Sequence, residues 1–253
     1  MNFKRMGVLV LLMVSGMCTG LQADMTGVYG LTDNKQKDAG TMTIQFRDAQ
    51  HIRYEFKGKK PDESGVLLLL QDKLYAITPQ GEVMDMAMVA GIAGALGGAQ
   101  SKPKQQVSFS LNSTGQNETV AGLHGDVYRW TDGKHSGVAV LSTDSRAQEL
   151  SQAMERIGDH MAQSMGDTLA TASFRAMRDH PALRSRGIVS SRDDSGSGMR
   201  LESIQSAPLA DALFVLPKKA NAAALPGLPN GLPNMNDPQI QMLMKEMLKQ
   251  QGR

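Results

Sequence analysis

Residues 120–144, VAGLHGDVYRWTDGKHSGVAVLSTD, form the pattern of a β-hairpin around which the rest of the chain is organised. The run VYRW (127–130) favours an extended chain, because β-branched and aromatic side chains pack well on a pleated sheet. Asp132-Gly133 then breaks the run with a glycine, which accepts positive φ. Residues 137–143 return as a second apolar strand. The hairpin holds the only Trp of the chain and is therefore expected to anchor a core.

Short apolar runs predict further strands on both sides of this hairpin. In residues 41–47, Met42, Ile44 and Phe46 alternate with polar residues, which is typical of a half-buried strand. The other predicted strands are 24–30, 51–57, 65–70, 73–78, 82–88 and 105–111 before the hairpin, and 188–191, 199–205 and 213–216 after it. Short turns separate the six predicted strands between residues 24 and 88, the strand at 41–47 included, which indicates an antiparallel meander.

Residues 145–177 predict the one long helix. Ser145 and Gln148 have the spacing of a capping box at its start, and His180-Pro181 follows its end. An apolar stripe at helical spacing runs along it. The stripe consists of Leu150, Met154, Ile157, Met161 and Met165.

Residues 1–23 have the pattern of a signal peptide that is cleaved after Ala23. Lys4 and Arg5 precede a short apolar run at 7–14. An uncleaved membrane anchor is an alternative, although the apolar run is short for a membrane span. Lipid modification at Cys18 is another, although the residue before it, Met17, is larger than that pattern prefers.

Cys18 is the only cysteine, so a chain cleaved after Ala23 contains no disulfide. Export without cysteines favours a bacterial periplasm. The full chain has 27 Lys and Arg residues against 25 Asp and Glu residues, and removal of Lys4 and Arg5 leaves the two signs equal. No dense basic patch is present in the sequence, which argues against nucleic acid as a partner.

Three segments differ in composition from the predicted sheet. Residues 89–99 are rich in Gly and Ala, and are expected to form a mobile loop, a short buried helix, a lid, or an interfacial element that touches lipid. Residues 218–236 are a Pro-, Ala- and Gly-rich linker. Residues 237–253 then predict a short amphipathic tail helix, which either packs back on the domain or docks on a partner.

The sequence offers no catalytic pattern. The five histidines lack metal-ligand spacing, and no nucleophile motif or phosphate-binding glycine loop is present in the sequence. We therefore predict no catalytic residue, no metal and no cofactor. The chain is rich in methionine, with 18 residues. Met84, Met86 and Met88 would share one strand face, which suits either Cu(I) or, in our preferred interpretation, an adaptable apolar binding surface.

Three pieces of the chain together resemble the bacterial domain-of-unknown-function family 4412. They are residues 65–88, with DKLYAITPQGEVMDM; residues 120–144; and residues 201–217, with LADALFVLP. The resemblance covers residues 26–217 and implies an exported protein with the curved antiparallel sheet of periplasmic lipoprotein carriers. It implies no activity and no functional residues. Gly125 stands where many members have a cysteine, and Val140 where an aromatic residue is usual.

We therefore expect an α+β, mainly antiparallel β protein. A curved sheet or half-barrel at residues 24–217 would carry the long helix, followed by the tail helix. The expected function is a non-enzymatic periplasmic binding or accessory protein that presents an apolar groove to lipid, lipoprotein or an envelope protein. The alternatives are an interaction protein acting through its C-terminal helix, and a hydrolase. The predicted groove residues are Leu68, Leu70, Met86, Trp130, Met154, Ile157 and Met161.

Overall fold

The computed structural model describes residues 24–35, 37–89, 91, 108–165 and 175–217. Within these residues, eleven strands form one sheet in the order β6-β5-β4-β3-β2-β1-β11-β10-β9-β8-β7. The strands are β1 (Met25–Thr32), β2 (Asp38–Asp48), β3 (His51–Lys57), β4 (Gly65–Leu70), β5 (Lys73–Ile77), β6 (Val83–Asp85), β7 (Ser110–Val120), β8 (Leu123–Thr131), β9 (Ser136–Ser142), β10 (Gly187–Asp193) and β11 (Gly198–Ser206). Each neighbouring pair is antiparallel.

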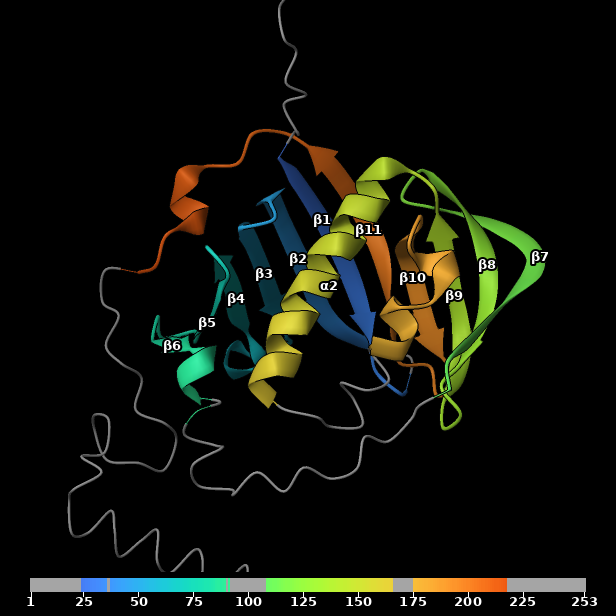
Figure 1. Cartoon of the computed structure of the whole chain (residues 1–253), viewed down its shortest axis with the longest axis horizontal. Helices are drawn as coiled ribbons and strands as arrows, with labels where there is room; N and C mark the ends of the chain where they lie inside the picture. The colour runs from blue at the N-terminus through green and yellow to red at the C-terminus, as the bar shows by residue number, and fades with distance from the viewer. Residues whose placement is uncertain (1–23, 36, 90, 92–107, 166–174, 218–253) are drawn as a thin grey trace, which may run out of the picture.

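One long helix, α2 (Ser145–Met165), lies across one face of this curved sheet (Figure 1). It packs on β10, β1, β2 and β5. Three short 3₁₀ helices also lie among the described residues: η1 (Pro61–Glu63), η2 (Pro181–Leu183) and η3 (Asp211–Phe214). The predicted α+β fold, a curved antiparallel sheet with one long helix on it, is confirmed.

Two tight turns fix the register of the predicted hairpins. Gln71 and Asp72 both have positive φ, 47° and 63°, and join β4 to β5 so that Leu70 lies opposite Lys73. Ala121 and Gly122 do the same between β7 and β8. Positive φ at both central residues matches the twist of the flanking strands. The register therefore decides which side chains of β4 and β8 face the helix.

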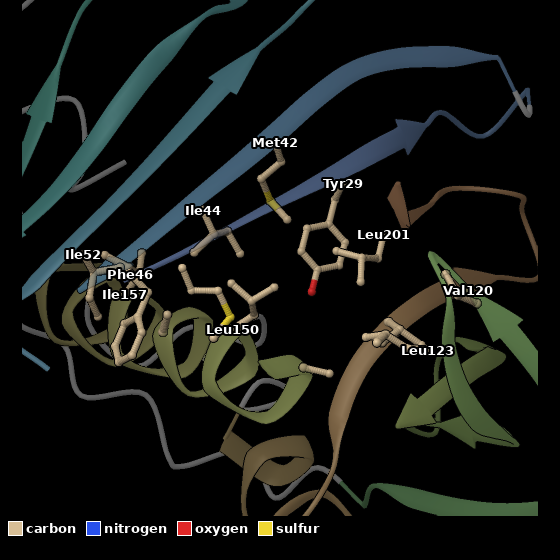
Figure 2. Close-up of a cluster of buried hydrophobic side chains, with 14 of the residues drawn as sticks. Tyr29, Met42, Ile44, Phe46, Ile52, Val120, Leu123, Leu150, Ile157 and Leu201 are labelled. Atoms are coloured by element: carbon tan, nitrogen blue, oxygen red, sulfur yellow. The ribbon is translucent and has the colours of Figure 1, made fainter. Parts of the chain in front are cut away.

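The main core lies between α2 and the sheet, where Leu150 and Ile157 of the helix meet Ile44, Phe46 and Ile52 (Figure 2). Tyr29 and Leu201 extend this core toward Val120 and Leu123 at the β7–β8 turn. Strands β8 and β9 are buried on both faces. Their alternate residues belong to the main core (Val127, Val140) and to a second cluster (Tyr128, Ala139, Leu141). The hairpin that contains Trp130 is thus a core element.

The structure corrects four details of the sequence prediction. Residues 86–89 are helical and not extended, because the carboxylate of Asp85 accepts a hydrogen bond from the Ala87 N–H (2.9 Å) and caps the turn. Leu213 and Phe214 of the predicted strand 213–216 belong to η3, and residues 215–216 form no strand, because β11 is already paired on both sides and leaves no edge there. Because residues 86–89 are helical, Met84, Met86 and Met88 do not share one strand face.

The other two corrections concern β7 and the start of α2. Strand β7 begins at Ser110, so only the last two residues of the predicted strand 105–111 belong to it, and residues 105–107 lie outside the described residues. The strand continues to Val120 through a polar run that the sequence did not mark, since an edge strand exposes its side chains and is held by pairing with β8. The helix is capped by Asp144, whose carboxylate accepts from the Arg146 N–H (3.0 Å). Gln148 instead donates its side-chain amide to the carbonyl of Thr143 (2.8 Å), so Ser145 and Gln148 form no capping box.

Several predicted segments lie outside the described residues. These are the signal peptide 1–23, residues 92–99 of the Gly/Ala-rich segment, residues 166–174 of the long helix, the linker 218–236 and the tail helix 237–253. Among the residues that are described, no helix combines the length and apolar character needed to cross a bilayer.

Candidate functional site

A cavity of about 310 Å³ lies between α2, the sheet and the segment around η2. Its walls come from α2, from β3 and β4, from residues 177–188 and from β11. The residues that line it are Tyr54, Leu67, Ser151, Met154, Glu155, Ile157, Gly158, Met161, Met177, Leu183, Arg186, Ile188 and Met199. We call it the methionine cavity, because four of these residues are methionines from three separate parts of the chain.

The helix places its share of the wall through simple periodicity. Met154, Ile157 and Met161 stand three and four residues apart, so they lie on one face of α2. Ile157 is almost fully buried, whereas Met154 and Met161 are half-buried and leave room beside them. Methionine has an unbranched, polarizable side chain that adapts to irregular apolar space. This wall can therefore close around ligands of differing shape.

One cationic side chain, Arg186, also lines the cavity. Its Nε atom is buried and has no hydrogen-bond partner. The guanidinium carbon lies 5.7 Å from the centre of the Tyr128 ring, and Nη2 lies 3.8 Å from Oδ2 of Asp126. Asp126 is about half exposed (49%), and an ion pair of this length in contact with solvent is weak. Arg186 therefore keeps an unused donor at the cavity wall.

Glu155 is the carboxyl group in the same wall. Burial raises its pKa above the usual range, and the negative charges of Asp159 and Asp179 act in the same direction. The guanidinium of Arg178 opposes this effect and lowers the pKa, but Arg178 is itself bound to Asp159 and Asp179. Glu155 thus accepts a proton more readily than an exposed glutamate does.

A second cavity of about 280 Å³ adjoins the first and shares Met177, Leu183 and Ile188 with it. Trp130 lines this second cavity, and its indole Nε1–H is buried without a hydrogen-bond partner. Phe109 stacks edge-on against His180 at a centroid distance of 5.7 Å. The shared residues form a wall between two apolar spaces.

The structure brings together some of the predicted groove residues and separates others. Met154, Ile157 and Met161 line the methionine cavity, and Trp130 lines the adjoining one. Met86 packs against the main core but lines neither cavity.

Leu68 and Leu70 alternate with Leu67 and Leu69, which face the helix, so they point to the opposite face of β4. Their assignment to the groove needs correction, because a continuous apolar run does not tell which of its residues face the helix.

Sequence reasoning missed the contribution of the segment after α2. Met177, Leu183, Arg186 and Ile188 come from residues that the sequence marked only as a helix end and a following strand. Tyr54 and Leu67 were also missed, although they lie directly opposite each other on β3 and β4. Ile52, Tyr54 and Phe56 alternate along β3, and this alternation would have placed Leu67 on their face, had the hairpin register been known.

Metal chemistry has no clear site in the described part of the chain, where no group of three or more His, Cys, Asp or Glu side chains could hold an ion. The polar groups of the methionine cavity suit binding by hydrogen bonds and charge.

Comparison with known proteins gives distant structural likenesses. No family model matches the sequence, and no match was found among curated proteins. The MucA/MucB complex of Pseudomonas aeruginosa is similar to 76% of this chain, at 12% identity and a TM-score of 0.38. A crystal structure of MucB gives 13% identity and a TM-score of 0.37, and PNGF-II gives 8% and 0.36.

The matched region spans 56% of the chain in the MucA/MucB complex and 30% of PNGF-II. Identities and TM-scores this low transfer no function to the chain. The resemblance to family 4412 stays a prediction.

Proposed function

We propose that this chain is an exported, non-enzymatic binding protein that holds an apolar ligand, an acyl chain, in the methionine cavity. The observation that carries the proposal is the cavity itself, an apolar space of about 310 Å³ between α2 and the sheet. Ligand sites are usually concave and mostly apolar, with a few placed polar groups. Four thioether side chains and two charged groups in one wall fit that description.

The size of the cavity suits a chain of medium length. An engineered protein cavity of about 150 Å³ binds benzene, with its six carbons. A cavity of about 310 Å³ therefore has space for roughly twelve carbons, by the same proportion. Burying eleven methylene groups is worth roughly 9 kcal/mol, and association costs at least about 4 kcal/mol. The apolar gain therefore exceeds this lower bound on the cost of association.

Export is supported by the pattern of residues 1–23, and cleavage after Ala23 would make Asp24 the first residue. Asp24 is already held in place, because its carboxylate accepts a hydrogen bond from the Leu209 N–H (2.6 Å) and pairs with Arg47. Intact-mass measurement of the chain recovered from a bacterial periplasm tests this point. A mass that includes residues 1–23 would contradict cleavage there.

Ligand binding is tested with an uncharged twelve-carbon probe, dodecan-1-ol, and the purified chain. We expect saturable binding to the wild type by titration calorimetry. Met154→Trp places a larger side chain in the cavity wall and should weaken binding at least fivefold. Met88→Trp is the matched control, because Met88 is 39% exposed and lines neither cavity.

Thermal unfolding of both variants checks that they fold. Equal binding by wild type, Met154→Trp and Met88→Trp, or no binding by the wild type, would overturn the proposed site.

A further inference from the structure

We propose that the ligand of the methionine cavity carries a carboxylate at its polar end and that Arg186 is the residue that receives it, so that the ligand class is a medium-chain fatty acid. This inference rests on the proposed function, because it assumes that the cavity takes an acyl chain. It adds the chemistry of the polar end and the residue that selects it.

The first support is the unused donor of Arg186. Nearly all buried N–H groups in folded proteins have an acceptor, yet the buried Nε of Arg186 has none. The Arg186 side chain is 26% exposed, and Arg186 lines the cavity. Because Nε itself is covered, a ligand oxygen would satisfy this donor after a small rotation of the Arg186 side chain toward the cavity.

The second support is the charge around Arg186. Asp126 is the acidic partner of this guanidinium, and its 3.8 Å separation is longer than a hydrogen bond. Tyr128 contributes its ring face, which attracts a cation without neutralising it. Glu155 lines the same cavity, but its pKa is raised by burial and it is not hydrogen-bonded to Arg186. The positive charge at the wall is thus only weakly compensated.

The third support is the shape of the donor group. Nε–H and an Nη–H of a guanidinium point in parallel and match the two oxygens of a carboxylate. An alcohol or an ester carries no anionic oxygen and would use this pair of donors poorly. The walls beside Arg186 are apolar side chains, including Leu183 and Ile188, which suit the chain that follows the carboxylate.

A matched pair of probes tests the inference. Dodecanoate and dodecan-1-ol have chains of equal length and differ at the polar end. Both are titrated into the full chain at pH 8, below the concentrations at which they aggregate. We expect the wild type to bind dodecanoate at least tenfold more tightly than dodecan-1-ol, as a charge-assisted double hydrogen bond implies.

Three variants locate the effect. Arg186→Gln should weaken dodecanoate binding at least tenfold, so that the preference for dodecanoate over dodecan-1-ol disappears. Arg186→Lys keeps the charge but loses the fork, so it should keep only part of the preference. Arg129→Gln is the control, since Arg129 is an exposed arginine that lines neither cavity and pairs with Asp194. It should behave as the wild type does.

The outcomes separate the inference from the function beneath it. Equal binding of both probes by the wild type, or an unchanged preference in Arg186→Gln, would refute the role of Arg186 and leave the apolar site standing. Failure of both probes to bind would overturn the proposed function as well. Should Arg186→Gln not fold, the two probes on wild type and Arg186→Lys decide the question, because an undiminished preference in Arg186→Lys would exclude recognition by the fork.

Discussion

The hydroxyl of Tyr29 donates a hydrogen bond to the backbone carbonyl of Ile188 at 3.1 Å, across 159 residues of sequence. Tyr29 stands on β1 and is fully buried, and burial raises the pKa of its phenol well above the usual range. Ile188 stands on β10 where the register with β9 shifts, and it lines both cavities. The bond therefore links the centre of the sheet to the wall that the two cavities share.

Tyr29→Phe should destabilise the protein by about 1–2 kcal/mol, because the substitution removes one buried hydrogen bond and keeps the ring. Urea unfolding at neutral pH measures the change. Tyr54→Phe is a matched control. Burial raises the pKa of Tyr54 to about 12, but no hydrogen bond to its hydroxyl is found within the described residues, so its loss should cost less than about 0.5 kcal/mol. Equal losses in the two variants would show that the bond to Ile188 contributes nothing specific.

The strands of this fold were predictable because their signal is local. His51–Lys57 alternates apolar and polar residues, and its bounds match the prediction. The hairpin of β8 and β9 was predictable for the same reason, since its turn and its two apolar runs are contiguous. Long-range features were not predictable. The direction of Leu67 and Leu68 depends on pairing with Tyr54 and Arg53, and a run of four leucines carries no record of that pairing.

The candidate site was predictable only on its helical side. The stripe of α2 marked Met154, Ile157 and Met161 as wall residues, because helical periodicity is a property of adjacent turns. Arg186 could not be found this way. It lies among polar residues with no periodicity, and its role follows from the fold bringing residues 177–188 beside α2. Asp85 illustrates the opposite failure, in which one capping side chain turned a predicted strand into a helical turn.

Gly187→Ala tests the contact between β10 and α2. A Cβ at position 187 would lie 2.1 Å from the backbone carbon and oxygen of Ala147, which cannot move without shifting the helix. We expect a loss of about 2–3 kcal/mol in urea unfolding, as in other overpacked cores. Gly65→Ala in β4 is the control, because its nearest neighbour would be the Ile77 carbonyl at 3.5 Å, an ordinary contact. Unchanged stability of Gly187→Ala would mean that α2 is not seated as described.

The β8–β9 turn gives a pH-dependent prediction through Asp132. Burial alone raises the pKa of this carboxyl. Hydrogen bonds from the backbone N–H groups of His135 (2.7 Å) and Lys134 (3.0 Å), and the nearby His135 ring, outweigh burial and hold the pKa at about 2. Because the folded-state pKa lies below the ordinary value of 3.8, the charged carboxylate stabilises the fold above about pH 4. This stabilisation is lost as the pH falls through 2.

Asp132→Asn keeps an acceptor at the turn but removes the charge. It should lower the free energy of unfolding by about 1 kcal/mol at pH 7, the typical difference between charged and neutral hydrogen bonds. The difference from wild type should shrink between pH 4 and pH 2. Asp62→Asn, at an exposed position in η1, should show no such trend. A difference that persists unchanged at pH 2 would exclude the carboxylate charge as the cause.

The segment after β11 is held on the sheet by Arg47. Its guanidinium pairs with Asp24 (3.2 Å) and Asp211 (2.7 Å) and lies 4.8 Å from the centre of the Phe214 ring. Phe214 is buried and also meets His51 edge-on. Residues 207–214 follow β11 and belong to no strand. Arg47, the Asp24 carboxylate, the backbone hydrogen bond from the Ala207 N–H to the Asp24 carbonyl (3.0 Å) and the burial of Phe214 together hold the segment in place.

Arg47→Gln should release this segment, because it leaves the partly buried Asp24 without its cation and removes the cover of Phe214. We expect a lower urea midpoint of unfolding and much faster protease cleavage within residues 207–217. Arg200→Gln removes another arginine from an ion pair, with Glu118, in which both partners are about half exposed. Such a pair is worth less than about 1 kcal/mol, so this variant should resist protease as the wild type does. If both variants are cleaved at the wild-type rate, Arg47 is not what fastens the segment, and the burial of Phe214 must suffice.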